Sequence, residues 1–192
     1  MRRAVLWLGG VVLVCAATAG LVWMASSGAA SFRVDGTRLI VSGTLTLSST
    51  ERIDSLIEQN PGITTIVLED IDRDSDSTSI VQKGALIRVL GLDTELAPGV
   101  TLAGDAVYLF LAGVERRMGE GAELLVSDWQ TPVGPASALP ADHPAHTERR
   151  RYVDAMLGGP GFYGFMINAA PVGEGHSVGP SEVAEYGLVT GG

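Results

Sequence analysis

The sequence predicts an α/β domain with repeated β-α units around a largely parallel sheet, preceded by one N-terminal transmembrane helix. Two observations predict this arrangement. Short runs rich in β-branched residues alternate with helical stretches between residues 38 and 127, an order typical of parallel β-α-β units. The first 30 residues contain no acidic residue and only two basic ones. We therefore divide the chain into an N-terminal segment (1–30), a linker (31–37) and one domain (38–192).

The N-terminal segment has the features of a membrane span. Residues 4–25 carry no charge and match the roughly 20 residues needed to cross a bilayer core. Arg2 and Arg3 precede the span, which predicts a cytoplasmic N-terminus and a domain on the extracytoplasmic, periplasmic side of the cell membrane. Two alternatives remain: an uncleaved single-pass signal anchor, favoured by the length of the span, or a signal peptide cleaved near residues 26–30.

The predicted strands and helices follow the hydrophobic pattern. Alternation and β-branched residues predict strands over 38–47, 63–68, 94–96 and 122–127. Apolar stripes and helix stop signals predict helices over 49–59, 80–90, 102–112, 147–157, 162–168 and 181–186. Ser48 and Glu51 have the spacing of a capping box at the start of the first helix.

The remaining segments complete the predicted order. Residues 69–79 form a polar loop, and residues 129–146, rich in Pro and Ala, form an irregular excursion. The stretch 102–112 is short, apolar and flanked by small residues, which favours a buried helix with Gly104 at its N-terminus. We expect the strands at 63–68 and 122–126 to lie in one sheet beside this helix.

Composition limits the possible partners and chemistry. The formal net charge of −9 disfavours nucleic acid and anionic lipid as partners of the domain. The only cysteine, Cys15, lies in the apolar segment, so the domain has no disulfide, no thiolate zinc site and no cysteine nucleophile. Nothing in the sequence indicates a cofactor.

Four phrases in this order resemble the Clp protease proteolytic subunit and its secreted or membrane-anchored relatives in the crotonase-like superfamily. They are GTLTLSSTERIDSLIEQNPGITTIVLE, VYLFLAGVERR, AELLVS and SEVAEYGLVT. The resemblance covers residues 38–189. It implies a crotonase/ClpP-like fold and a protein that forms homo-oligomers.

The resemblance also implies a site, but the sequence departs from it. In that family a serine at the start of the buried helix is the nucleophile, a histidine is the base, an acidic residue orients the histidine, and a Gly-Gly turn stabilises the oxyanion. The nucleophile position falls on Gly104, and the histidine position on Ser127 or Asp128. No aspartate follows Asp154, and residues 69–79 replace the Gly-Gly turn. The resemblance therefore implies degenerate catalytic positions.

Other polar residues are weaker candidates. Asp105 could serve as an acid or base, or it could cap the buried helix. Asp70, Asp72, Asp74 and Asp76 alternate in one segment; they lack the Gly and Glu of an EF-hand loop, which leaves loose surface binding of calcium or a solvated acidic loop. The run at 149–151 contains three arginines, a pattern typical of a solvated helix face or an intersubunit salt bridge.

Two functions are consistent with these observations. In the first, the protein is a membrane-anchored, extracytoplasmic ClpP-like protein that lacks serine-peptidase activity and binds an unknown protein or peptide partner as a scaffold. In the second, it is a peptidase or crotonase-like enzyme of the same fold with relocated catalytic residues. The absence of the expected serine and histidine favours the first.

Overall fold

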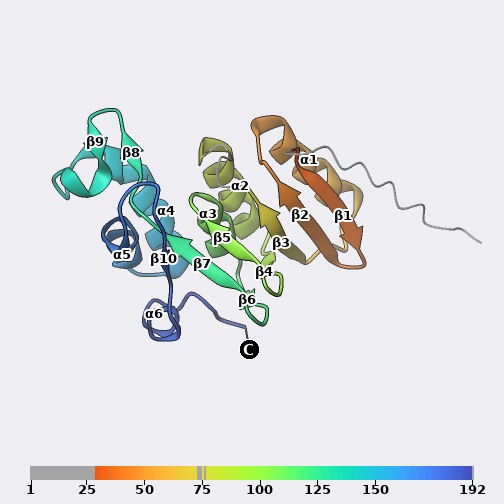
Figure 1. The fold of residues 1–192 in the computed structure, drawn as a ribbon. Coiled ribbons are helices and arrows are strands. Elements are labelled where there is room, and N and C mark those ends of the chain that lie inside the picture. Colours follow the sequence, from red (N-terminus) through yellow and green to blue (C-terminus); the bar gives the residue numbers. More distant parts are fainter. Residues whose placement is uncertain (1–28, 73–74, 76, 192) are drawn as a thin grey trace, which may run out of the picture.

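The computed structural model describes residues 29–72, 75 and 77–191, in which strands alternate with helices before a helical C-terminal part (Figure 1). The larger sheet has the strand order β1-β2-β3-β4-β6. Its strands are β1 (Ser31–Asp35), β2 (Arg38–Gly43), β3 (Thr65–Ile71), β4 (Asp93–Leu96) and β6 (Arg116–Met118). Strands β2, β3, β4 and β6 are parallel, and β1 is antiparallel to β2. The prediction of a largely parallel sheet is confirmed.

A second, smaller sheet has the order β10-β7-β5. Its strands are β5 (Thr101–Ala103), β7 (Glu123–Val126) and β10 (His176–Ser177). The expectation that the strands near 63–68 and 122–126 share one sheet is therefore wrong. After β4 the chain turns at Pro98 and Gly99, and β5 pairs with β7, whereas β6 takes the open edge of β4.

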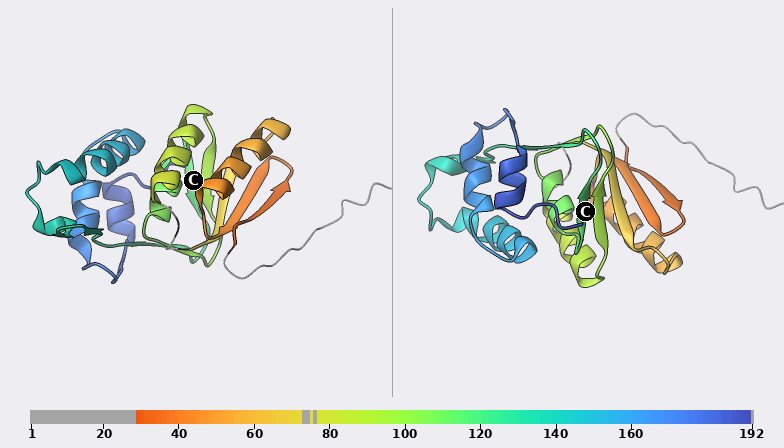
Figure 2. Two further views of the ribbon diagram at one scale, coloured as in Figure 1. Left: turned by 90° about the horizontal axis from the view of Figure 1, so that it is seen from above. Right: turned by 90° about the horizontal axis from the view of Figure 1, so that it is seen from below.

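Helices surround these sheets. They are α1 (Leu47–Gln59), α2 (Ser77–Val89), α3 (Ala106–Leu111), α4 (Thr147–Leu157), α5 (Phe162–Ala169) and α6 (Pro180–Glu185), with short 3-10 turns η1 (Ala136–Ala138) and η2 (Pro144–His146). Figure 2 shows α1 and α2 on one side of the larger sheet and α4 and α5 grouped at the end remote from β1. All six residues of α3 are buried, so this helix lies at the centre of the core.

The buried helix is shorter than predicted. Residues 101–103 form β5, and α3 begins only at Ala106. Between them Gly104 has a φ of 62°, a left-handed conformation that favours glycine and interrupts the regular structure. The predicted helix over 102–112 is thus a strand, a sharp turn and a short helix.

Three further expectations, all for residues before 80, are wrong. The segment expected to be a linker (31–37) forms β1 and a two-residue turn to β2, so the domain begins before residue 38. The capping box of α1 consists of Thr46 and Ser49. The acidic segment is shorter than the predicted loop over 69–79, because β3 extends to Ile71 and α2 begins at Ser77.

The predicted membrane span over 4–25 lies outside the described residues. Among the helices that the structure does describe, none is long and apolar enough to cross a membrane.

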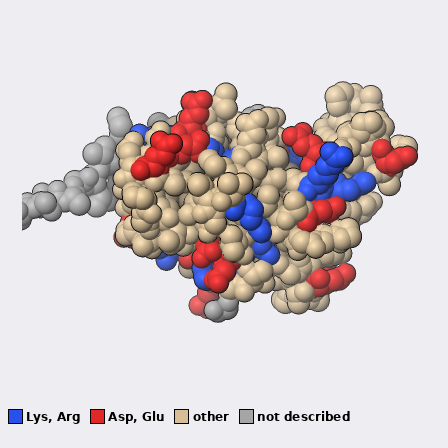
Figure 3. Space-filling view, turned by 180° about the vertical axis from the view of Figure 1, so that it is seen from behind, with Lys and Arg blue, Asp and Glu red and all other residues tan. Residues whose placement is uncertain are grey.

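Charges are mixed on the helix-covered side of the domain. Figure 3 shows acidic and basic side chains there in small groups separated by uncharged surface. Nucleic-acid binding uses basic side chains that follow the phosphate backbone. The face in Figure 3 carries no such continuous basic stripe, which agrees with the net charge of −9.

Candidate functional site

The implied site lies where the chain passes from β5 into α3. Gly104 forms the turn, and Asp105 is the N-cap residue of α3. The Asp105 side chain makes no hydrogen bond to the backbone of the helix. The alternative that Asp105 caps the helix is therefore wrong, and its carboxylate is engaged elsewhere.

Asp105 forms an ion pair with Arg149 of α4. The guanidinium donates to both carboxylate oxygens, through Nη1 to Oδ1 and through Nη2 to Oδ2, the latter at 3.1 Å. Ser77, the first residue of α2, donates its hydroxyl to Oδ2 and accepts from Arg149 Nη2 at 3.0 Å. Bidentate arginine–carboxylate pairs are among the stronger hydrogen-bonded contacts in proteins. Three elements that are distant in sequence therefore meet at this carboxylate.

Aromatic rings enclose the guanidinium. Its central carbon lies 4.3 Å from the centroid of the Trp129 ring and 5.5 Å from that of Tyr108, distances that allow cation–π attraction. Nη1 also donates to the Tyr108 hydroxyl at 3.3 Å. We call Ser77, Asp105, Tyr108, Trp129 and Arg149 the Asp105 cluster. The side chains of Arg149 and Asp105 are only 15% and 19% exposed.

The expectation of a solvated arginine run is therefore wrong for Arg149. Its helix α4 turns this side chain inward against α3 and the start of α2. Arg150 is different: it donates to the Ala141 carbonyl at an exposed position and lies over the Tyr163 ring.

Burial and charge set the protonation of the cluster. Burial raises the pKa of the Tyr108 hydroxyl to about 12, although the nearby Arg149 acts in the opposite direction. Burial lowers the pKa of the Arg149 guanidinium, but the hydrogen bonds and charge interactions with Asp105 and Tyr108 together outweigh it, and the pKa lies above its ordinary value. At neutral pH the arginine is therefore charged and the tyrosine neutral.

Each described histidine has a partner that is neither serine nor threonine. His143 Nδ1 accepts from the backbone N–H of Ala145, and His176 Nε2 lies 3.0 Å from Glu182. His146 is buried, and its Nδ1 lies 2.8 Å from the Tyr163 hydroxyl, which also accepts from Trp129 Nε1. A serine hydroxyl is a weak nucleophile unless a base accepts its proton. The histidines in the described part of the chain are not placed for that role.

The expected histidine position has a structural role. Ser127 follows the end of β7, and Asp128 is buried. The Asp128 carboxylate accepts from the backbone N–H groups of Trp129 and Ser137, at 2.8 and 3.1 Å. It therefore ties together the two ends of the loop that contains β8 (Gln130–Thr131) and β9 (Gly134–Pro135), and in doing so positions Trp129 over Arg149.

The alternating aspartates do not form a cation site within the described residues. Asp70 is exposed in β3, and Asp72 Oδ2 accepts from the Thr44 hydroxyl at 3.0 Å. Asp74 and Asp76 lie outside the described residues. Among the residues that the structure describes, no three or more potential metal ligands lie close enough together to hold a metal ion.

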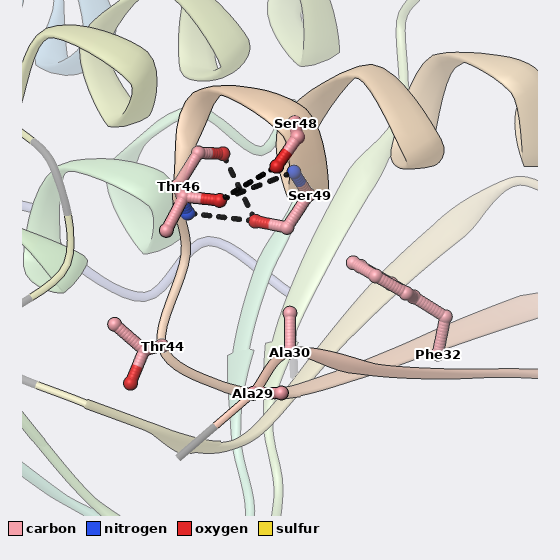
Figure 4. Close-up of a pocket in the computed structure, with 7 residues that line it drawn as sticks. All are labelled: Ala29, Ala30, Phe32, Thr44, Thr46, Ser48 and Ser49. Carbon is pink, nitrogen blue, oxygen red and sulfur yellow. Dashed lines mark hydrogen bonds between the residues drawn. The ribbon is translucent and has the colours of Figure 1, made fainter. Parts of the chain in front are cut away.

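A separate surface depression of about 430 Å³ lies between the start of β1 and the N-terminus of α1 (Figure 4). It is lined by Ala29, Ala30, Phe32, Thr44, Thr46, Ser48 and Ser49. The hydroxyls of Thr46 and Ser49 are hydrogen-bonded to each other's backbone as the capping box. The depression shares no residue with the Asp105 cluster.

The arrangement at Asp105 favours charge pairing over proton transfer. Both oxygens of the carboxylate accept from Arg149, and one also accepts from Ser77. A general base must be free to reach the proton it abstracts. The cluster therefore holds together α2, α3 and α4, and the serine in it lacks a histidine partner.

Sequence reasoning identified Gly104 and Asp105 but missed the residues around them. Ser77 was part of the predicted polar loop, Trp129 was part of the irregular excursion, and Arg149 was one of three adjacent arginines. The sequence did contain a signal for Arg149. It precedes the buried Tyr152 and Val153 by three and four residues, a spacing that places all three side chains on the same face of α4.

The buried tyrosines predict a loss of stability at alkaline pH. The folded-state pKa of Tyr108 is raised above its unfolded value of about 10, so its contribution to stability is complete below pH 10 and is lost as the pH rises toward 12. We expect Tyr108 to account for a decrease of about 2–3 kcal/mol in the free energy of unfolding over this range. Urea unfolding at pH 9, 10, 11 and 12 measures it. An equal pH dependence in Tyr108→Phe would contradict the assignment.

Comparisons with known proteins identify the fold. No family model matches the sequence, and no curated protein matches it. Among solved structures, an enoyl-CoA hydratase from Shewanella pealeana superposes with a TM-score of 0.54 at 10% identity, over 83% of this chain and 66% of that one.

Two other solved structures agree with this match. An enoyl-CoA hydratase/isomerase from Marinobacter aquaeolei has a TM-score of 0.54 at 12% identity, over 83% of this chain and 68% of that one. A membrane-bound stomatin-specific protease, solved in complex with a substrate peptide, has a TM-score of 0.54 at 16% identity, over 78% and 71%. The predicted resemblance is confirmed in the arrangement of strands and helices: the chain has the crotonase/ClpP-like fold.

Proposed function

We propose that this protein is a crotonase/ClpP-fold binding module without serine-peptidase activity, held on the extracytoplasmic side of a membrane. One observation carries the proposal: at the start of α3 the chain has Gly104 followed by a carboxylate paired with Arg149. Glycine supplies no nucleophile, and both oxygens of the Asp105 carboxylate accept hydrogen bonds from Arg149, so the carboxylate is held by the arginine and is not directed at a substrate.

An extended peptide or protein segment is the partner that we propose. The support is a fold likeness to a protease that was solved with a substrate peptide. Loss of the nucleophile would leave peptide binding without cleavage. The acidic balance of the chain, with 22 acidic and 13 basic residues, favours a basic or neutral segment.

The membrane attachment is supported by the sequence of the N-terminal segment. Residues 4–25 are uncharged, and Arg2 and Arg3 precede them. Protease added to intact spheroplasts is expected to digest the domain, whereas it leaves a cytoplasmic marker intact. Protection of the domain until the membrane is permeabilised would contradict the proposed orientation.

A second candidate function rests on Ser77. Its hydroxyl donates to Asp105, so a serine and a carboxylate are in contact beside the implied site. In an enzyme of this fold, Asp105 would act as base and Ser77 as nucleophile. The ion pair with Arg149 disfavours this chemistry, because a proton on Asp105 would remove the charge interaction between its carboxylate and the guanidinium.

Reactivity toward a fluorophosphonate serine probe separates the two functions. We expect no labelling of the full chain in detergent and no cleavage of casein, because no histidine in the described part of the chain contacts a serine, and the carboxylate beside Ser77 is paired with Arg149. Gly104→Ser is expected to remain unreactive for the same reason. Hydration of crotonyl-CoA is assayed in parallel, since enoyl-CoA hydratases share the fold.

The outcome that supports the enzyme is equally specific. Labelling or turnover that disappears in Ser77→Ala and in Asp105→Asn, but persists in Ser137→Ala, would overturn the binding-module proposal. Ser137 is a suitable control because its backbone N–H, and not its hydroxyl, contacts Asp128.

A further inference from the structure

The outer edge of β1 is unpaired among the described residues. Strand β1 ends the order β1-β2-β3-β4-β6, and its only partner in the sheet is β2. The opposite edge of the sheet, at β6, is partly covered by the C-terminal segment. The N–H groups of Thr190 and Gly191 donate to the carbonyl of Arg116 in β6, at 3.0 and 3.2 Å. An unpaired strand edge presents a row of backbone donors and acceptors to a pairing segment.

The register of the hairpin indicates which backbone groups face outward. Asp35 and Arg38 flank the two-residue turn, and the register then pairs Arg33 with Ile40 and Ser31 with Ser42. In an antiparallel pair, hydrogen-bonded residues alternate with residues whose backbone groups point away from the partner strand. A two-residue hairpin closes on a hydrogen-bonded pair, so the N–H and C=O groups of Phe32 and Val34 point to the open edge.

The charges of β1 are complementary to those of a second, antiparallel copy of β1. If Val34 lies opposite Val34 of the second copy, Arg33 lies opposite Asp35 of the second copy, and Asp35 lies opposite Arg33 of the second copy. Within the chain Arg33 lies 3.7 Å from Asp35 and 3.4 Å from Glu69, but the side chains of Arg33 and Asp35 are 49% and 69% exposed, so both remain accessible to a partner. Opposite charges on facing residues stabilise a strand pair, and like charges destabilise it.

The apolar side chain at the centre fits the same register. Val34 is 37% exposed, although its cross-strand neighbour Leu39 is fully buried. The symmetric register places the two Val34 side chains against each other and lets the two Val34 residues exchange both backbone hydrogen bonds. In any other register of β1 against a second β1, at least one of the two charged residues would no longer face a residue of opposite charge.

We propose that β1 pairs with β1 of a second copy of this chain, antiparallel and centred on Val34, so that the two larger sheets become continuous. This gives the homo-oligomer expected from the resemblance a specific contact. It goes beyond the proposed function and does not depend on whether the Asp105 cluster is inactive. Five residues per copy form a small contact, so the pairing is weak and covalent capture is the suitable measurement.

Disulfide capture of the full chain in detergent tests the pairing. Val34→Cys in a Cys15→Ser background is expected to form a disulfide-linked dimer, because facing residues in a hydrogen-bonded pair have Cα atoms about 5.5 Å apart, within the range for disulfides. Val133→Cys in the same background is the matched control, since Val133 is 74% exposed in the β8–β9 turn. Its dimer yield measures random collision within shared micelles.

Charge reversal tests the register. In the Val34→Cys background, Arg33→Asp is expected to slow dimer formation about tenfold, because both cross-strand pairs become repulsive. Adding Asp35→Arg restores opposite charges and is expected to return the rate to within about twofold. Rates of dimer formation are normalised to the rate at which a small maleimide labels the same thiol. Circular dichroism verifies that each charge-reversal variant is folded.

Two results would overturn the proposal. One is a dimer yield for Val34→Cys no greater than that for Val133→Cys, which would leave the edge to another occupant such as an extended peptide. The other is a double reversal as slow as Arg33→Asp alone, which would exclude the symmetric register. Neither result bears on fluorophosphonate reactivity, so failure of this proposal and failure of the proposed function are distinguishable.

Discussion

Replacing Arg149 with methionine is expected to lower the free energy of unfolding by about 3 kcal/mol, the lower end of the range for removing one partner of a buried ion pair, because this pair is partly buried. The Asp105 carboxylate would lose its bidentate partner while remaining 19% exposed. The Trp129 and Tyr108 rings would also lose the cation between them. Urea unfolding followed by tryptophan fluorescence measures the change, because Trp129 reports directly on the cluster.

Arg150→Met is the matched control for this change. Arg150 is the next residue on α4, and its hydrogen bond to the Ala141 carbonyl is exposed. Exposed charged contacts contribute about 0–1 kcal/mol, so the control is expected to stay within that range. Equal destabilisation by the two variants would show that the loss comes from α4 itself and not from the Asp105 cluster.

A double substitution separates the ion pair from general packing. Arg149→Met/Asp105→Leu removes the unpaired carboxylate as well as the guanidinium, and replacement of both charges by apolar groups is often close to neutral. We expect the double variant to recover at least about 1 kcal/mol relative to Arg149→Met alone. Strictly additive losses would contradict coupling between Arg149 and Asp105.

The position of the site could be predicted from the sequence, but its contents could not. Gly104 and Asp105 were identified because a short apolar stretch flanked by small residues resembles the helix after a family nucleophile. The partner of Asp105 is Arg149, 44 residues later. The helical period places Arg149 on the face of the buried Tyr152 and Val153, but its pairing with Asp105 arises from how α4 packs on α3.

The fold was predicted best where the hydrophobic pattern is long. The parallel order of β2, β3 and β4, with α1 and α2 between them, follows from runs of four or more apolar or alternating residues. Strands of two or three residues, such as β5 and β10, were missed because their pairing is decided by tertiary contacts with β7. Strand β1 was missed because only one of its faces contacts the core.

The C-terminal phrase that carried the closest resemblance is held by a buried arginine. Arg116 of β6 is 4% exposed, and its guanidinium donates to the carbonyls of Leu188, Gly113 and Gly187, each at 2.9 Å. Burial lowers the pKa of Arg116, and the three carbonyls satisfy the hydrogen bonds of the buried cation. The backbone of Arg116 also pairs with Thr190. One residue therefore fixes the C-terminal segment to the edge of the larger sheet.

Arg116→Met is expected to destabilise the protein by about 3–5 kcal/mol, because it leaves the carbonyls of Leu188 and Gly187 without their side-chain donor, and unsatisfied groups cost about 1–3 kcal/mol each before relaxation. Hydrogen exchange at the amides of Leu188 and Thr190 is expected to accelerate more than exchange in β3, since the segment would open locally.

Arg117→Met is the matched control: Arg117 is 38% exposed and contacts Asp93 and Glu115, so a loss of at most about 1 kcal/mol is expected. A similar small loss for Arg116→Met, with unchanged exchange at Leu188 and Thr190, would show that the C-terminal segment is held by the packing of Leu188 and α6 rather than by the arginine.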